Sequence, residues 1–219
     1  MKHIIAVNAS PRKDWNTAAL VRAAAEGART SGAEAEVIDL YSLGQFTGCI
    51  SCFGCKTGNN RGRCVCRDAL SEVLEKIRSC DGLILGTPNY LGEATAGFRA
   101  LYERLVFQYI TYNTERPNCN EHHIPVLFIM TSNAPDEAYQ QGGSFQSLVR
   151  KYQGALSSFI GPTEVLVAGD TKQVSDYSRF DWTFFDPAAK SARHDAVFPE
   201  KIALAEKLGA KLTEGGYVD

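Results

Sequence analysis

The chain has 219 residues, a length that fits one domain of ordinary size, and 44% of them are apolar, enough to bury a sizeable core. Its formal net charge of −2 leaves no basic surplus to drive nucleic-acid binding. The apolar run near Met1 is far too short for a signal peptide or a membrane span. We therefore expect a cytoplasmic protein that binds neither nucleic acid nor a membrane. In that reducing compartment, the 7 cysteines are not expected to form a disulfide framework.

The first part of the chain predicts a strand, a loop, a helix and a second strand. Residues 3–7 form a short apolar run typical of a buried strand, and residues 17–29 are rich in helix formers. A second strand is expected at 34–40, and the unit is long enough for a parallel crossover. A loop rich in glycine and cysteine then occupies residues 44–67, and Asp68 is expected to cap the helix that follows.

The rest of the chain alternates helices with strands. Short buried runs predict strands at 82–86, 125–130 and 163–167. Apolar residues at helical spacing predict helices around 70–77, 98–105 and 145–152, and a last helix at 199–212. Residues 170–198 show no clear period, and we interpret them as an irregular arm. A segment this long without regular structure is usually functional or interfacial.

This alternation predicts an α/β fold with a doubly wound, five-stranded parallel sheet in the flavodoxin-like order 2-1-3-4-5. We expect residues 1–219 to form a single domain, with the cysteine-rich loop after the second strand and the arm after the fifth. Ligands of such sheets bind beyond the carboxyl ends of the strands, where the strand order reverses. The loops after the first, third and fourth strands are therefore the candidate site.

Polar and charged side chains follow the first strand. Ser10, Asn16 and Thr17 offer donors, and Arg12 offers positive charge, directly before a helix N-terminus whose free N–H groups favour an anion. The loop is therefore a candidate cradle for one phosphate. The alternative interpretation is an ordinary capped turn, with Asn16 or Thr17 as the cap.

The loops after the third and fourth strands complete the candidate site. Asn89 and nearby backbone amides offer hydrogen bonds to a flat heterocycle, and Tyr90 offers a ring that can pack on it. Pro88 fixes the backbone, and Gly92 permits a close approach. Each loop also has the simpler interpretation of a polar turn. The candidate binding residues here are Thr87, Pro88, Asn89, Tyr90, Leu91, Gly92, Thr131, Ser132 and Asn133.

The cysteine-rich loop carries a metal-ligand pattern. Cys49, Cys52 and Cys55 recur at a spacing that lets three thiols reach three corners of one iron–sulfur cluster. Cys64 is the preferred fourth ligand of a [4Fe–4S] cluster, and Cys66 is the alternative. A zinc site, a thiol–disulfide site and simple packing are the competing interpretations. Zinc sites usually use two separated C-x-x-C pairs, which this motif does not have.

The chain resembles the NADPH-dependent FMN reductase group of the flavodoxin-like superfamily. The resemblance rests on Ala9-Ser10-Pro11-Arg12 and Trp15-Asn16-Thr17 after the first strand, and on residues 86–92 after the third. Ala9 and Trp15 stand where the family has glycines, and Asn89 stands where an apolar residue is commoner. The resemblance implies that Ser10, Arg12, Asn16 and Thr17 bind the phosphate of FMN. It also implies that residues 87–92 hold the isoalloxazine ring and that residues 131–133 close over it.

The cysteine motif is similar to that of the iron–sulfur flavoproteins, a subgroup with a compact motif after the second strand. The similarity covers Cys49 to Cys55, then Gly62-Arg63-Cys64-Val65, and then Asp68. It implies an FMN-dependent oxidoreductase in which a [4Fe–4S] cluster passes electrons to the flavin. We expect a ferredoxin or NAD(P)H as the electron donor, and a small molecule such as a quinone or another flavin as the acceptor. The family also implies a homodimer or a homotetramer.

Three rival functions fit the same sequence. The first is a clusterless NAD(P)H-dependent FMN or quinone reductase with structural cysteines. The second is a flavodoxin-like electron carrier that turns over no substrate of its own. The third is a zinc-stabilised nucleotide-binding module.

Overall fold

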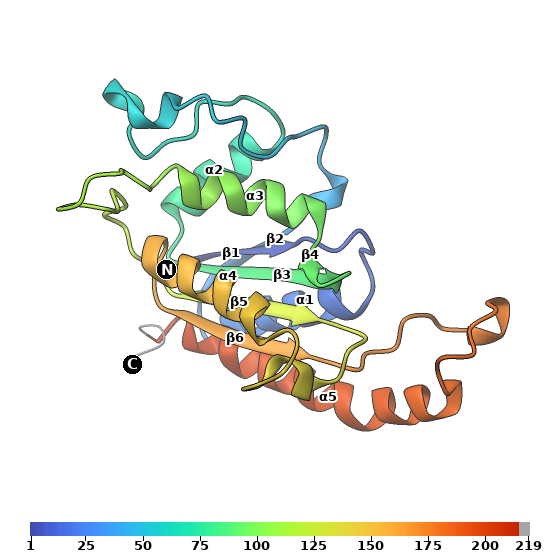
Figure 1. Cartoon of the computed structure of the whole chain (residues 1–219). Coiled ribbons are helices and arrows are strands. Elements are labelled where there is room, and N and C mark those ends of the chain that lie inside the picture. The colour runs from blue at the N-terminus through green and yellow to red at the C-terminus, as the bar shows by residue number, and fades with distance from the viewer. Residues whose placement is uncertain (215–219) are drawn as a thin grey trace.

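The computed structural model describes residues 1–214 and has an α/β fold built around one sheet (Figure 1). Its parallel strands are β1 (His3–Asn8), β2 (Glu34–Asp39), β3 (Gly82–Tyr90), β5 (Val126–Thr131) and β6 (Thr163–Ala168), in the order β2-β1-β3-β5-β6. The predicted doubly wound order is confirmed. The predicted number of five strands is wrong, because a short strand, β4 (Glu93–Ala94), pairs antiparallel with the end of β3. Two residues after a tight turn carry too little pattern to be recognised as a strand.

Helices cover both faces of the sheet. They are α1 (Asn16–Thr30), α2 (Leu70–Ser79), α3 (Ala96–Phe107), α4 (Gln146–Phe159) and α5 (Pro187–Lys211). Side chains of β1 alternate between the faces. Ile4 and Ala6 join a core with α1 and α5, whereas Ile5 and Val7 join a core with α2, α3 and α4. Short 3₁₀ helices occupy Leu40–Ser42, Gly54–Lys56, Gly58–Asn60, Asp136–Tyr139 and Tyr177–Arg179.

Two glycines bring α1 and α5 into backbone contact. A Cβ on Gly27 would lie 1.9 Å from the carbonyl oxygen of Glu206, and a Cβ on Gly209 would lie 1.9 Å from that of Ala24. Any side chain at either position would therefore push the two helices apart. The close packing lets α5 complete the core on this face of the sheet. Among the described helices, none is long and apolar enough to cross a membrane.

The irregular arm is shorter than expected, because residues 187–198 of the predicted segment are helical. Helix α5 begins at Pro187 rather than at 199, and Asp186 caps it by accepting hydrogen bonds from the N–H groups of Ala188 (2.9 Å) and Ala189 (3.1 Å). Pro199 lies inside the helix. A proline is easily taken as the first residue of a helix, where its missing N–H costs nothing. The irregular segment is therefore 170–186, interrupted by one 3₁₀ turn.

Candidate functional site

One cleft lies at the carboxyl ends of the parallel strands. These strand ends point to the right in Figure 1. The loops after β1, β3 and β5 form it, as the topology predicts. The segment after β6 adds a wall that we did not predict from the sequence. The cleft is lined by Ser10, Arg12, Trp15, Asn16, Thr17, Pro88, Asn89, Tyr90, Thr131, Ser132, Asn133, Thr171, Lys172 and Gln173.

The loop after β1 is held by its own side chains. The Asn8 side chain accepts a hydrogen bond from the N–H of Ser10 (3.1 Å), and the Ser10 hydroxyl accepts one from the N–H of Arg12 (3.1 Å). Helix α1 then begins at Asn16, and its N-cap, Trp15, provides no side-chain hydrogen bond. The alternative of an ordinary side-chain-capped turn is therefore not what forms. An uncapped helix N-terminus at the edge of a cleft suits an anion.

The segment after β6 is fastened to this loop. The backbone carbonyl of Lys172 accepts hydrogen bonds from Trp15 Nε1 (3.0 Å) and Asn16 Nδ2 (2.8 Å). Arg12 donates to the carbonyl of Gln173 and lies over the Trp15 ring, 4.8 Å from its centroid. Thr171, Lys172 and Gln173 have no motif of their own. Their position directly after the strand beside β5 is the signal that could have identified them.

The loop after β3 is a tight hairpin between β3 and β4. Leu91 (φ +54°) and Gly92 (φ +79°) occupy its two central positions, as a two-residue hairpin turn requires. Asn89 is fixed at both ends, because its amide donates to the Tyr139 hydroxyl (2.6 Å) and accepts from the N–H of Gly92 (2.9 Å). Pro88, Asn89 and Tyr90 therefore line the cleft.

Three residues predicted for this loop do not line the cleft. Thr87 is fully buried and accepts a hydrogen bond from the N–H of Thr95 (3.2 Å). Leu91 is fully exposed at the tip of the hairpin, and Gly92 lies beside Phe145. These three residues shape the hairpin, and Leu91 is left as an apolar tip directed to solvent.

Glu93 anchors the other end of the hairpin. It pairs with Lys151 (2.7 Å) and Arg99 (2.9 Å), and it accepts a hydrogen bond from the Tyr152 hydroxyl. Burial raises the pKa of this carboxyl, but the hydrogen bonds from Lys151, Tyr152 and the N–H of Ala94 outweigh it and hold the pKa at about 2. Glu93 is therefore ionised under ordinary conditions and fastens the hairpin to α3 and α4.

The loop after β5 joins the first loop across the cleft. The hydroxyls of Thr131 and Thr17 are hydrogen bonded at 2.7 Å, and both residues are buried. The carbonyl of Ser132 accepts from the N–H and the hydroxyl of Thr171, each at 2.9 Å. Asn133 accepts from Lys190 Nζ at 2.7 Å. All three predicted residues of this loop therefore reach the cleft.

The residues of the cleft fit a flat ligand that carries a phosphate. None of the 14 lining residues is acidic, and Arg12 and Lys172 are basic. The uncapped N-terminus of α1 supplies backbone donors on the same side as Ser10. A phosphate would meet positive charge and N–H groups there, and an aromatic ring system would meet Tyr90 and Trp15.

The cysteine-rich loop covers α2 and α3 on the side away from the sheet (Figure 1). Its cysteines come together, since Cys49, Cys52, Cys55, Cys64 and Cys66 all line one small pocket. The opposite wall of this cysteine pocket includes Arg104 and Phe107 of α3 and Gln108, the residue that follows this helix. Within residues 1–214, however, no group of three or more metal-ligating side chains is already arranged around a point that could hold a metal ion.

Arg104 ties both ends of the cysteine-rich loop to α3. Its guanidinium pairs with both oxygens of Asp68 (2.6 and 2.7 Å) and also donates to the carbonyls of Thr47 (3.3 Å) and Cys66 (2.8 Å). Burial raises the pKa of Asp68, but hydrogen bonds from Arg104 and from the N–H groups of Thr47 and Leu70 outweigh it and lower the pKa. The bond from Leu70 (3.0 Å) lies at the start of α2, where Asp68 was predicted to act as a cap.

Two donors on this wall have no partner. Arg104 is 1% exposed and Gln108 is 2% exposed, and neither Arg104 Nε nor Gln108 Nε2 makes a hydrogen bond within the described chain. Buried donors are normally satisfied, so two of them beside five thiols indicate that sulfur in this pocket is their acceptor. Sulfur atoms of a cluster are such acceptors. The donor set therefore fits a cysteine-bound iron–sulfur centre. The sequence in and just after α3 carries no motif that marks Arg104 or Gln108 as part of such a site.

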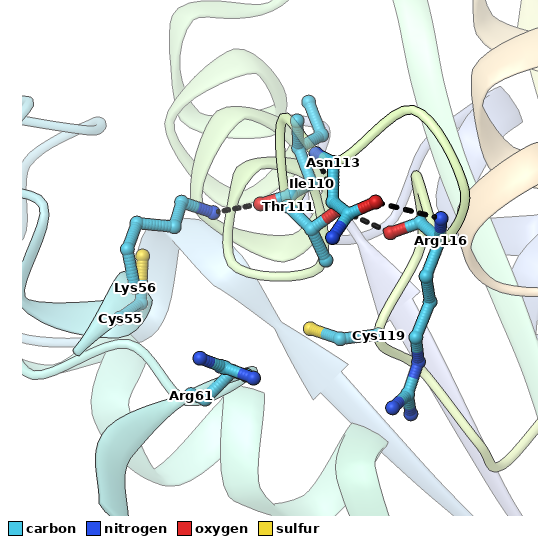
Figure 2. A pocket seen from close by; sticks show the side chains of 8 residues that line it. All are labelled: Cys55, Lys56, Arg61, Ile110, Thr111, Asn113, Arg116 and Cys119. Carbon is cyan, nitrogen blue, oxygen red and sulfur yellow. Dashed lines mark hydrogen bonds between the residues drawn. The ribbon is translucent and has the colours of Figure 1, made fainter. Parts of the chain in front are cut away.

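A basic groove borders the cysteine pocket at Cys55, which lines both. Figure 2 shows the part of the groove that contains Cys55. It consists of two adjoining hollows that share Arg61, Arg116 and Cys119, and its basic side chains are Lys56, Arg61, Arg78 and Arg116. Glu121, paired with Arg116, is the single acidic residue among those lining it. Lys56 donates to the carbonyls of Ile110 (2.6 Å) and Phe107, and so caps the C-terminus of α3.

The sequence model of a family described as NADPH-dependent FMN reductase matches residues 2–141. An iron–sulfur flavoprotein of Methanocaldococcus jannaschii is 37% identical over 101 residues, which cover 46% of this chain and 50% of that protein. One from Archaeoglobus fulgidus is 35% identical over 103 residues, covering 46% of this chain and 47% of that protein. The chain thus spans about half the length of the curated relatives it matches.

Solved structures of similar fold share little sequence with the chain. A NAD(P)H:quinone oxidoreductase from Methanothermobacter marburgensis has a TM-score of 0.70 at 15% identity, covering 96% of this chain and 98% of that one. An FMN-dependent NADH-azoreductase from Bacillus anthracis, solved in complex with FMN, has a TM-score of 0.64 at 14% identity, covering 95% of this chain and 100% of that one. At these identities the likeness shows the fold alone.

Proposed function

The chain belongs to the NADPH-dependent FMN reductase family, and from that premise we propose that it is an FMN-dependent oxidoreductase that also carries a [4Fe–4S] cluster in the cysteine pocket. The observation that carries the proposal is the pairing of two sites in one chain: an acid-free cleft at the carboxyl ends of the strands and a pocket lined by five cysteines. When bound, FMN supplies the redox chemistry, which includes both one-electron and two-electron transfer.

The residues of the cleft would bind and orient the flavin. Ser10, Arg12, Asn16 and Thr17, with the start of α1, would hold the phosphate. Pro88, Asn89 and Tyr90 would contact the ring, while Thr87, Leu91 and Gly92 set the hairpin that presents them. Thr131, Ser132 and Asn133 would close the opposite side. No side chain is required as acid, base or nucleophile, because the flavin carries the chemistry.

The cysteines would hold the cluster. Cys49, Cys52, Cys55 and Cys64 are the ligands that we propose, with Cys66 as the alternative fourth ligand. Burial is the largest cause that raises the pKa of the Cys55 thiol, and the nearby Cys64 thiol raises this pKa further. Cys64 is favoured as the fourth ligand because its thiol lies that close to Cys55. The backbone of Cys66 is bound to Arg104 instead.

The basic groove supports an electron donor with a negatively charged surface. Lys56, Arg61 and Arg116 line the hollow that contains Cys55, and Arg78 lines the adjoining one. A donor that binds in this groove would therefore approach the cluster site directly. An acidic ferredoxin is such a donor. NAD(P)H is the alternative, and it would deliver hydride at the flavin cleft.

The irregular segment supports self-association. It projects from the carboxyl end of the sheet (Figure 1) and carries the exposed rings of Phe180, Trp182 and Phe184. Phe180 and Trp182 stack with centroids 4.4 Å apart. Exposed aromatic rings on a projecting segment form a surface that a second copy of the chain could bind. We therefore propose a homodimer or a homotetramer. Light scattering that gave the 23.9 kDa monomer mass at micromolar concentration would contradict it.

The second candidate function is a clusterless NAD(P)H-dependent FMN or quinone reductase. The observation in its favour is that the cysteines share a pocket without forming a ready-made metal site in the described chain. A flavodoxin-like electron carrier is the non-enzymatic rival. Saturable oxidation of NAD(P)H by the purified protein would exclude the carrier.

The test is a flavin, iron and zinc assay with an ultraviolet–visible spectrum on protein purified without oxygen. We expect about one FMN and about four irons per chain. Cys64→Ser should lose iron, whereas Cys66→Ser should retain it, and the reverse result would make Cys66 the ligand. Flavin without iron would favour the clusterless reductase. One zinc per chain without flavin would favour a zinc-stabilised module.

A further inference from the structure

We propose that the side chains of Gln108 and Arg104 donate hydrogen bonds, from Nε2 and Nε respectively, to sulfur atoms in the cysteine pocket and thereby raise the reduction potential of the cluster. The inference rests on the proposed function, because it needs a cluster as acceptor. Both residues belong to the segment that packs against the cysteine-rich loop, outside the cysteine motif itself.

The two donors lie on the same face of one helix segment. Residues 104 and 108 are four positions apart, so their side chains lie one above the other on α3 and its last turn. Both line the cysteine pocket, and both are almost completely buried. Their unpaired nitrogen atoms therefore have no access to bulk water and face the region where the five cysteines gather.

The other polar atoms of each side chain fix its orientation. Gln108 Oε1 accepts the N–H of Cys64 at 3.0 Å, which identifies the oxygen end of the amide and leaves Nε2 as the free donor. The guanidinium of Arg104 is held by Asp68 and by the carbonyl of Cys66, which leaves Nε. The cysteine-rich loop thus fixes the orientation of both side chains, and in each of them one nitrogen, Gln108 Nε2 or Arg104 Nε, is left free to donate.

Hydrogen bonds of this kind favour the reduced cluster. Reduction adds negative charge to the sulfur atoms, so a donor stabilises the reduced state more than the oxidised one, and the potential rises. The rival explanation is one buried water. The pocket has a volume of about 20 Å³, enough for a single water that could satisfy both donors. In that case neither side chain would interact with the cluster.

The experiment uses pulsed electron paramagnetic resonance on the reduced holoprotein, labelled with glutamine that carries ¹⁵N only in its side-chain amide. Gln108 is the only glutamine among the residues that line the cysteine pocket. A ¹⁵N coupling to the cluster should therefore appear in the wild type and disappear in Gln108→Glu, which keeps an oxygen for the N–H of Cys64. The neutral variant Gln108→Leu should lower the potential by about 59 mV, which corresponds to a tenfold change in a one-electron equilibrium.

The control is Gln153→Leu. Gln153 is a partly buried helical glutamine on α4, where its amide donates to the carbonyl of Thr163 at 3.1 Å. This variant should leave both the coupling and the potential unchanged. A four-iron cluster in the wild type with no ¹⁵N coupling, or a potential that Gln108→Leu does not move, would overturn the inference and leave the proposed function standing. A wild type without iron after anaerobic purification would overturn both.

Discussion

Replacing Arg104 with methionine would leave the Asp68 carboxylate without its counter-ion. The side chain of Arg104 is 1% exposed and that of Asp68 is 14% exposed, so the pair lies largely out of water. Removing one partner of a buried pair costs about 3–5 kcal/mol, because the other charge stays buried and unpaired. Two backbone carbonyls, those of Thr47 and Cys66, would also lose their donor. For a chain of this size, a loss of that magnitude lowers the melting temperature by roughly 6–20 °C.

The assay is thermal and urea unfolding followed by circular dichroism at a fixed, saturating FMN concentration. Arg99→Met on the same helix is the matched control, since Arg99 pairs with Glu93 and Glu103 but is 39% exposed, and such pairs contribute less than about 1 kcal/mol. Adding Asp68→Asn to Arg104→Met should recover part of the loss by removing the unpaired charge. If Arg104→Met cost no more than Arg99→Met, the buried ion pair would not be what holds the cysteine-rich loop.

Three further predictions concern the flavin cleft, the hairpin and the helix contact. Ser10→Ala should weaken FMN binding about 10- to 150-fold, as expected for one hydrogen bond to a charged group, and fluorescence titration would measure it. Because the pKa of Glu93 is lowered to about 2, its stabilising effect is complete above its ordinary pKa and is lost as the pH falls toward 2. In Glu93→Gln the midpoint urea concentration of unfolding should therefore decrease less between pH 5 and pH 2 than it does in the wild type. An equal decrease in both proteins would contradict this. Gly209→Ala should lower the free energy of unfolding by about 1–3 kcal/mol, because the new Cβ would overlap the backbone of α1. The control Gly154→Ala, whose Cβ would meet nothing within 4 Å, should raise it by about 0.5–1 kcal/mol. Equal effects of the two variants in urea unfolding would refute the close contact between α1 and α5.

The sheet order and the flavin loops could be predicted because they depend on local pattern and topology together. Buried strands alternate with striped helices, and the strand order then fixes which loops meet. The segment 171–173 is not predicted from the sequence. It is joined to the first loop through two backbone carbonyls: that of Lys172 accepts from Trp15 and Asn16, and that of Gln173 accepts from Arg12. Backbone contacts of this kind have no residue signature. The start of α5 is not predicted from the sequence, because Pro199, which lies inside the helix, resembles the first residue of one.

The cysteine spacing predicted a shared pocket, but the sequence did not indicate what lies opposite it. Arg104 is a charged residue between the apolar positions Leu101 and Leu105, and such a residue is usually solvated rather than buried. Only its pairing with Asp68, 36 residues away in sequence, explains its burial. Spacing also cannot separate Cys64 from Cys66, because both reach the same pocket. That assignment stays a prediction, as does the single domain.

The backbone contacts of Gly27 with Glu206 and of Gly209 with Ala24 also affect how the chain folds during synthesis. The two glycines are separated by 182 positions, so at ribosomal rates of roughly 5–20 residues per second α1 waits about 9–36 s for its partner helix. During that interval the small-residue face of α1 is open to chaperones and to other nascent chains. The stretch that matches the family, residues 2–141, is therefore not expected to be an autonomous folding unit. A premature stop before Pro187 should give a translation product that is degraded, because its core on that face of the sheet is never closed.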